Sequence, residues 1–232
     1  MKLFVALVFC FLALFGVAAL PLPAKSSDHV EIRHEKAQTI MHGKEQLKNI
    51  KNAAADSHFL NEQSVRVANF PENPENHAIL VEVFKNNFMP LIENIRQNLV
   101  AIRDGKLLVE KVNAGADCMG KASASVDPST KLASFGPKFH SKTKTKEERA
   151  GIFIHEKSHA FANTKDYFAK SDGRPLGASE RKHVANICGY ADKDIALLSS
   201  YSSVWNADSY KKLAELAVRQ YKANHGHPPA KK

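Results

Sequence analysis

Cysteine is scarce in this 232-residue sequence, which holds only Cys10, Cys118 and Cys188. No two of them are spaced as CxxC, the pattern expected of a zinc site built from cysteines. No P-loop, Ser-His-Asp arrangement or internal repeat stands out either. Lysine and arginine outnumber aspartate and glutamate by 33 to 24, but no aromatic residues alternate with the modest basic cluster Lys142–Arg149. The sequence therefore does not favour nucleic acid as a partner.

Long apolar runs are also missing, except for Leu3–Leu20 at the start of the chain. This run follows Lys2 and ends in small residues, as a secretory signal peptide does. An uncleaved membrane anchor is the alternative, because eighteen apolar residues can span a bilayer; Pro21 and Pro23 favour cleavage. We expect cleavage after Ala19, which changes the formal net charge from +9 to +8. The mature protein is then expected to be secreted, without membrane attachment.

The remaining residues, about 213 of them, are enough for one domain with a substantial core. We expect a signal peptide, a flexible segment, a single domain and a disordered tail, at residues 1–19, 20–30, 31–224 and 225–232. In an oxidising compartment Cys118 and Cys188 form an even pair, and we expect a disulfide between them. The loop that it closes would stabilise the fold by roughly 4 kcal/mol.

Helical periodicity dominates the pattern of apolar residues. One helix is expected over Glu31–Asp56 and a second over His77–Arg103, where Pro90 should kink or divide it. Short alternating segments between glycine, proline and serine residues follow over Leu107–Phe139 and predict a small sheet. A last helix is expected to begin near Asn206, a capping candidate. The predicted fold class is therefore α+β and mainly helical.

The sequence contains an HExxH motif, in which His155 and His159 are four residues apart. On an α-helix such residues share a face, so two imidazoles can bind one metal ion, and Glu156 can reach a water molecule on that metal. Apolar residues on both sides of the motif predict a buried helix. A catalytic zinc site needs a third protein ligand and an open position. Asn163 is expected to end the helix, so that the chain can offer Asp166 to the same metal.

Other interpretations of these residues are open. The motif also fits a surface helix with two scattered histidines, and Asp166 also fits an ordinary loop aspartate. Glu180 is a rival third ligand, since thermolysin-like zinc peptidases take a glutamate from a later helix. Asp192 is a more distant rival. Neither has a supporting pattern around it, so Asp166 is preferred.

The HExxH region through Asp166 and the later segment Asn206-Ala207-Asp208-Ser209-Tyr210 resemble the aspzincins, the family of deuterolysin and peptidyl-Lys metalloendopeptidases. In that family HExxH is followed by a GTxDxxYG motif and later by a helix that begins near NADSY. The resemblance spans roughly Leu107–Ala217. It implies a zincin-like fold with a small sheet beside the HExxH helix. It also implies one Zn²⁺ ion, held by His155, His159 and Asp166.

The resemblance further implies a secreted zinc metalloendopeptidase that hydrolyses a protein or peptide substrate, with Glu156 as the general base. We expect it to be a monomer. Two other classes are open: a catalytically inactive, secreted zincin-like binding protein, and a protein that binds zinc only for stability or sequestration. Neither needs a carboxylate at position 156. Lys131–Phe135 is expected to be an edge strand that binds extended substrate by strand addition, with a plain structural hairpin as the alternative.

This sequence departs from the family pattern at several positions. Asn163 stands in place of the family's glycine, and Ala169 stands in place of a tyrosine that stabilises the oxyanion. Tyr190 is the candidate to replace that tyrosine. Asp208 matches an acidic residue that binds the substrate lysine in lysine-specific members, and is expected to bind substrate. Lys211 occupies the place of a second acidic residue, and its positive charge should oppose binding of a substrate lysine.

Overall fold

The structure is a computed structural model that describes residues 30–32, 41–111, 123–166 and 198–226. The predicted signal peptide lies outside this part of the chain, and so do both cysteines of the predicted disulfide, Cys118 and Cys188. Among the described residues, no helix combines the length and the apolar character needed to cross a bilayer.

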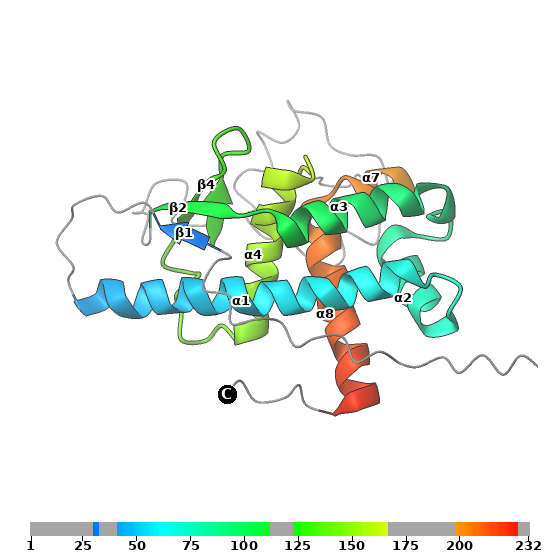
Figure 1. Cartoon of the computed structure of the whole chain (residues 1–232), viewed down its shortest axis with the longest axis horizontal. Coiled ribbons are helices and arrows are strands. Elements are labelled where there is room, and N and C mark those ends of the chain that lie inside the picture. The colour runs from blue at the N-terminus through cyan, green and yellow to red at the C-terminus, as the bar shows by residue number, and fades with distance from the viewer. Residues whose placement is uncertain (1–29, 33–40, 112–122, 167–197, 227–232) are drawn as a thin grey trace, which may run out of the picture.

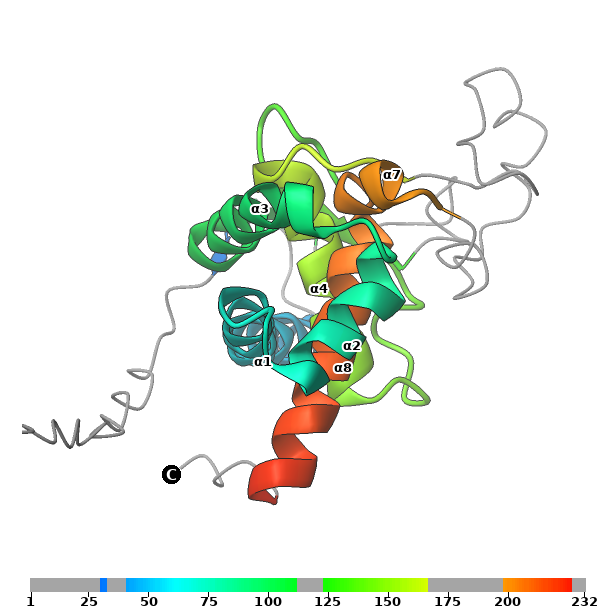
Figure 2. The same cartoon turned by 90° about the vertical axis from the view of Figure 1, so that its right-hand side faces the viewer.

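In the described part of the chain, five long helices form the main body of the fold (Figures 1 and 2). They are α1 (Met41–Asn69), α2 (Pro74–Phe84), α3 (Ile92–Asp104), α4 (Lys146–Phe161) and α8 (Ala207–His225). A short 3-10 helix, η2 (Met89–Leu91), precedes α3, and a short helix, α7 (Ser200–Val204), precedes α8. Helix α4, which carries HExxH, packs against α1, α3 and α8.

Both predicted boundaries of the first helix, Glu31 and Asp56, are wrong. Residues Val30–Ile32 form strand β1, and α1 runs from Met41 to Asn69. Its C-terminal half lacks a clear apolar pattern because polar residues lie on its buried side. Ser57 and Ser64 are buried there, and each hydroxyl donates to a carbonyl of its own helix. Periodicity of apolar residues therefore misses this half.

The second predicted helix is divided as expected. Helix α2 begins after Asn73, whose side chain accepts hydrogen bonds from two backbone amides of the first turn, and it ends at Phe84. The chain resumes helical structure at η2, which contains Pro90. Proline cannot donate a backbone hydrogen bond and is tolerated at the start of a helix, so it lies at the junction with α3. The predicted last helix begins at Ala207, directly after Asn206.

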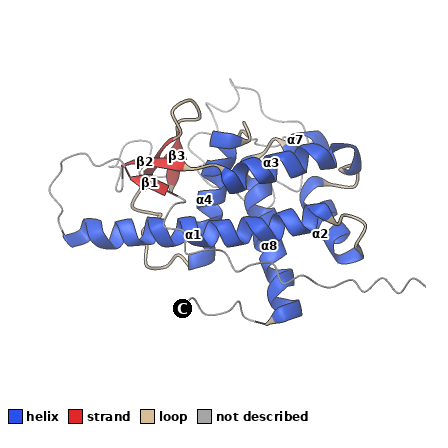
Figure 3. Ribbon diagram, viewed as in Figure 1, coloured by secondary structure: helices blue, strands red, loops and turns tan. Residues whose placement is uncertain are grey.

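A four-stranded sheet lies beside α4 (Figure 3). Its strands are β1, β2 (Leu107–Lys111), β3 (Ala124–Val126) and β4 (Leu132–Phe135), in the order β1-β2-β4-β3. Strands β1, β2 and β4 are parallel, and β3 is antiparallel to β4. The mainly helical α+β fold with a small sheet beside the HExxH helix is thereby confirmed.

The predicted position of the edge strand is wrong. Strand β4, which covers most of Lys131–Phe135, lies inside the sheet between β2 and β3. A tight turn closed by the Lys131 amide and the Asp127 carbonyl, 2.8 Å apart, folds β3 back along β4. The other side of β4 is occupied by β2, whose pairing is non-local and leaves no mark in the sequence. The edge strand on this side of the sheet is therefore β3, next to β4.

Helix α4 lies between two hydrophobic clusters. Ala150 and Ile154 belong to a cluster made by the helices, whereas Phe153 and Ala160 belong to a cluster shared with the sheet. The ring of Phe153 stacks on Phe135 of β4 with a centroid distance of 5.5 Å. Because α4 is covered on both of these sides, the HExxH residues from His155 to Ser158 are buried, as the apolar flanks of the motif predicted.

Candidate metal centre

Both ends of α4 are defined by local sequence. Thr145 is the N-cap: its side chain accepts from the Glu148 amide at 3.1 Å, and the Glu148 carboxylate accepts from the Thr145 amide at 2.6 Å. This capping box satisfies backbone donors of the first turn. At the other end the helix stops at Phe161, and Asn163 has a left-handed backbone with φ of 51°. Asn163 therefore redirects the chain two residues beyond the last turn, as predicted.

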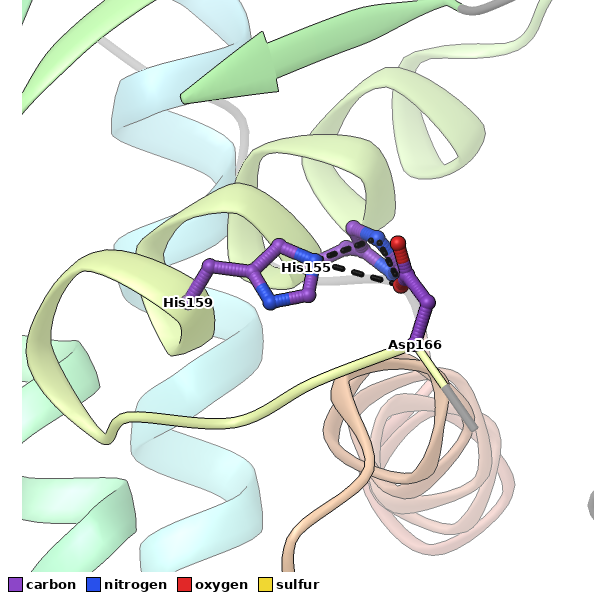
Figure 4. Close-up of side chains that lie close together, drawn as sticks. All are labelled: His155, His159 and Asp166. Atoms are coloured by element: carbon purple, nitrogen blue, oxygen red, sulfur yellow. Dashed lines mark hydrogen bonds and ion pairs between the residues drawn. The ribbon is translucent and has the colours of Figure 1, made fainter. Parts of the chain in front are cut away.

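Three side chains from this segment meet at one point (Figure 4). His155 Nε2 lies 3.1 Å from His159 Nε2, and each of these nitrogens lies 3.2 Å from Asp166 Oδ1. The three atoms form a nearly equilateral triangle. The structure thus brings together the two histidines of HExxH and the aspartate that the sequence favoured as the third ligand.

The far nitrogens of both rings have acceptors. His159 Nδ1 is 2.9 Å from the Thr164 carbonyl oxygen, and His155 Nδ1 is 2.9 Å from Asp208 Oδ1. A backbone carbonyl only accepts hydrogen bonds, as does an ionised carboxylate, so each Nδ1 carries the hydrogen. In a neutral imidazole the lone pair is then on Nε2. Two lone pairs and a carboxylate oxygen therefore converge, an arrangement that requires protons or a cation between them.

The triangle has the size of a zinc site. In a regular tetrahedron the distance between ligands is about 1.63 times the distance from the centre, so edges of 3.1–3.2 Å correspond to about 1.9 Å from a central ion. Zinc binds nitrogen and oxygen ligands at about 2.0–2.2 Å, within the tolerance of about 0.2 Å expected of a real site. The described residues provide three ligands to this group, one fewer than a tetrahedral ion takes. The residues present therefore fit a zinc ion.

Two backbone hydrogen bonds hold the ligand loop in place. The Lys165 amide donates to the Trp205 carbonyl at 2.9 Å, and the Ala207 amide donates to the Lys165 carbonyl at 3.1 Å. They form a short parallel bridge between the loop and the start of α8. Because Asp166 follows Lys165 directly, this bridge fixes the third ligand beside the two histidines.

The charge states of His155, His159 and Asp166 depend on one another. Burial lowers the pKa of His155, but hydrogen bonds to Asp166 and Asp208 outweigh it and raise this pKa well above its usual value. Burial alone would raise the pKa of Asp166, yet hydrogen bonds from His155 and His159 hold it well below its usual range. Zinc binds the deprotonated forms of these ligands, so metal binding here should release protons.

Glu156 is buried, with 5% of its surface exposed. Burial raises the pKa of its carboxyl group, while the positive charges of His155 and His159 oppose that rise. A carboxyl group with a raised pKa beside a metal site is suited to accept and return a proton near neutral pH.

The remaining predicted site residues divide into two groups. Asp208, predicted to bind substrate, lies in the first turn of α8 and faces His155 with one carboxylate oxygen. The aliphatic part of Lys211, one turn further along, packs over Gly151 of α4. The predicted oxyanion residue lies outside the described residues, together with the rival ligands and the family's missing tyrosine position: Tyr190, Glu180, Asp192 and Ala169.

Sequence reasoning missed the residues that orient the histidines. Thr164 provides the carbonyl for His159, and its hydroxyl lies 2.7 Å from the buried Ser158 hydroxyl. The contact between Asp208 and His155 joins residues 53 positions apart. No spacing rule could have found this contact, because it depends on how α8 packs against α4.

No protein-family model matches the chain, and no curated protein matches it. Among solved structures the chain is similar to a zinc peptidase from Grifola frondosa, with 18% sequence identity and a TM-score of 0.49 over 74% of this chain and 94% of that one. Similarity at this level does not support an argument about function. The function is therefore argued from the geometry of the site.

Proposed function

We propose that this protein is a secreted zinc metalloendopeptidase of the aspzincin type. The observation that carries the proposal is the triangle of His155, His159 and Asp166, which is sized for zinc, together with the buried carboxyl group of Glu156. Secretion is proposed from the signal-like segment at residues 1–19. A site that held zinc only for structure would not need the buried carboxyl group of Glu156.

His155, His159 and Asp166 would hold the metal. When bound, a zinc ion supplies a Lewis acid that makes a water molecule nucleophilic near neutral pH and polarises the peptide carbonyl group. Glu156 accepts the proton of the attacking water as the new C–O bond forms. It returns that proton to the amide nitrogen as the C–N bond breaks, which releases a carboxylate and an amine. Tyr190 is proposed as the residue that stabilises the oxyanion.

The sheet offers a binding surface for an extended peptide. Strand β3 contacts α4 and, among the described strands, pairs only with β4. We propose that the edge of β3 opposite β4 provides backbone groups to which a peptide can add as a further strand. Strand addition uses backbone groups of the substrate and not its side chains. We therefore propose that the substrates are proteins or peptides and that binding at β3 does not select for particular substrate side chains.

The test is digestion of a mixed peptide library by the purified protein, with and without a chelator. We expect cleavage that the chelator abolishes and added zinc restores. Glu156→Gln should reduce the cleavage rate by about 10²–10⁴-fold while zinc still binds at one ion per chain. Glu147→Gln is the matched control, because Glu147 is exposed on the same helix and pairs with Lys222. Cleavage that persists at the full rate in Glu156→Gln would refute the proposal.

A further inference from the structure

We propose that Asp208 is a positioning residue, which holds the imidazole of His155 in the tautomer that binds the metal and thereby sets the metal affinity of the site. This inference rests on the metal site proposed above and assigns a role to a residue outside the ligand triangle.

The contact is short and protected from solvent. Asp208 Oδ1 lies 2.9 Å from His155 Nδ1, and the two side chains are 12% and 8% exposed. Because the carboxylate accepts, Nδ1 must donate, which leaves the lone pair on Nε2. That atom is the one that lies 3.1 Å from His159 Nε2 and 3.2 Å from Asp166 Oδ1. Asp208 therefore acts on the metal through His155.

The fold holds Asp208 at the start of a helix. It lies in the first turn of α8, where the helix dipole stabilises negative charge. The bridge between Lys165 and Asn206 fixes this end of α8 against the ligand loop. The start of α8 thus holds the loop that carries Asp166, and it also carries Asp208, which orients His155.

The two histidines have different partners. His159 donates to a neutral backbone carbonyl, whereas His155 donates to a carboxylate. A carboxylate partner raises the basicity of the opposite ring nitrogen more than a neutral acceptor does, and loss of such a partner weakens metal binding by about 10–100-fold. His155 is therefore expected to be the stronger of the two ligands, and its strength depends on Asp208.

The experiment measures zinc dissociation constants by competition with a fluorescent zinc indicator, in the absence of peptide. Asp208→Asn keeps the size of the side chain but removes its charge, and we expect zinc to bind about 10–100-fold more weakly. Glu215→Gln, two turns further along α8, is the matched control and should change the constant less than about twofold. Asp208→Glu retains the charge and should bind zinc more tightly than Asp208→Ala.

A second measurement separates positioning from substrate binding. With zinc at saturating concentration, Asp208→Asn should have the wild-type KM for a peptide substrate, since its defect lies in metal affinity. An unchanged zinc constant together with a KM at least about tenfold higher would overturn the inference and assign Asp208 to the substrate. Equal zinc constants and equal KM values in Asp208→Asn and wild type would also overturn it.

The outcomes distinguish this inference from the proposed function. If the wild-type protein binds no zinc, the metal site itself fails. If it binds zinc and Asp208→Asn binds zinc equally well, only the role of Asp208 fails. Circular dichroism of the chelator-treated variants verifies that each one is folded, and Asp208→Glu provides a second comparison should Asp208→Asn not fold.

Discussion

Gly105 is a position where adding a single methyl group should change the free energy of unfolding. It follows the last residue of α3, and its backbone has φ of −65° and ψ of 141°, which alanine adopts without strain. A Cβ atom at this position would lie 2.3, 2.4 and 2.7 Å from three ring atoms of Phe161. Glycine is therefore required here by the close approach of a ring and not by backbone conformation.

Phe161 is partly buried, and its ring packs against the hydrophobic cluster that α4 shares with the sheet. It is the last residue of α4, and the Lys131 ammonium group lies 5.4 Å from its ring centroid while donating to the carbonyl of Ala160. Forcing a methyl group into such a site lowers the free energy of unfolding by about 1–3 kcal/mol. Replacing glycine in a compatible conformation raises it by about 0.4–1 kcal/mol through the unfolded chain. For Gly105→Ala we expect a net loss of about 1 kcal/mol, within the range of about 0–2.6 kcal/mol that these two effects allow.

Removing the ring should reverse the sign of this effect. In a Phe161→Ala background the clash is gone, and Gly105→Ala should then raise the free energy of unfolding by about 0.4–1 kcal/mol. The four proteins of this double-mutant cycle are compared by urea unfolding, followed by circular dichroism in the presence of a chelator. The reasoning is refuted if Gly105→Ala has the same effect in both backgrounds.

Three further predictions concern the core and the metal. Tyr210→Phe should lower the free energy of unfolding, measured by urea unfolding, by about 1–3 kcal/mol. The reason is that the buried hydroxyl donates to the Val204 carbonyl oxygen at 2.8 Å and accepts from Asn98 Nδ2 at 2.7 Å. An unchanged midpoint of the urea transition would contradict this prediction. Burial lowers the pKa of Lys157 from 10.5 to about 8, so the unfolded chain binds more protons between these values. The free energy of unfolding of the chelator-treated wild type should therefore rise with pH across that window by up to about 3 kcal/mol, and Lys157→Met should lack this rise. Zinc at a hundred times its dissociation constant should raise the free energy of unfolding by about 2.7 kcal/mol, measured as a higher Tm, and His159→Ala should show no such increase.

The sequence was most informative where structure is local. The two histidines of α4 meet because of helix geometry alone, and Asn163 ends that helix because asparagine tolerates a left-handed backbone. Pro90 lies in η2, at the start of the helical segment that continues as α3, because the start of a helix tolerates a residue without a backbone N–H. These features depend on residues within a few positions of each other, so composition and spacing were enough to predict them.

Prediction failed where the outcome depends on distant partners. The buried side of α1 contains Asn61, whose amide donates to the Leu99 carbonyl on α3 at 2.8 Å. A polar residue with such a partner packs in the core, yet from sequence it indicates an exposed face. The same reason hid the order of the strands, since β4 is an inner strand only because β2 pairs with it.

The ligands of the site come from α4 and from the loop that follows it, and contacts elsewhere in the protein hold both in place. Helix α4 provides two ligands, and the backbone bridge from Lys165 to the start of α8 holds the third in place. These hydrogen bonds are made by the protein alone, and Asp208 orients His155 from the same helix terminus. A preorganised site does not lose free energy to ordering its own residues when a ligand binds. Binding of a metal should therefore stabilise a fold that already exists, in contrast to small zinc domains whose chain is unfolded without metal. The reason for this difference is the two large buried clusters on either side of α4. Their apolar contacts hold the HExxH helix in place without involving the metal ligands.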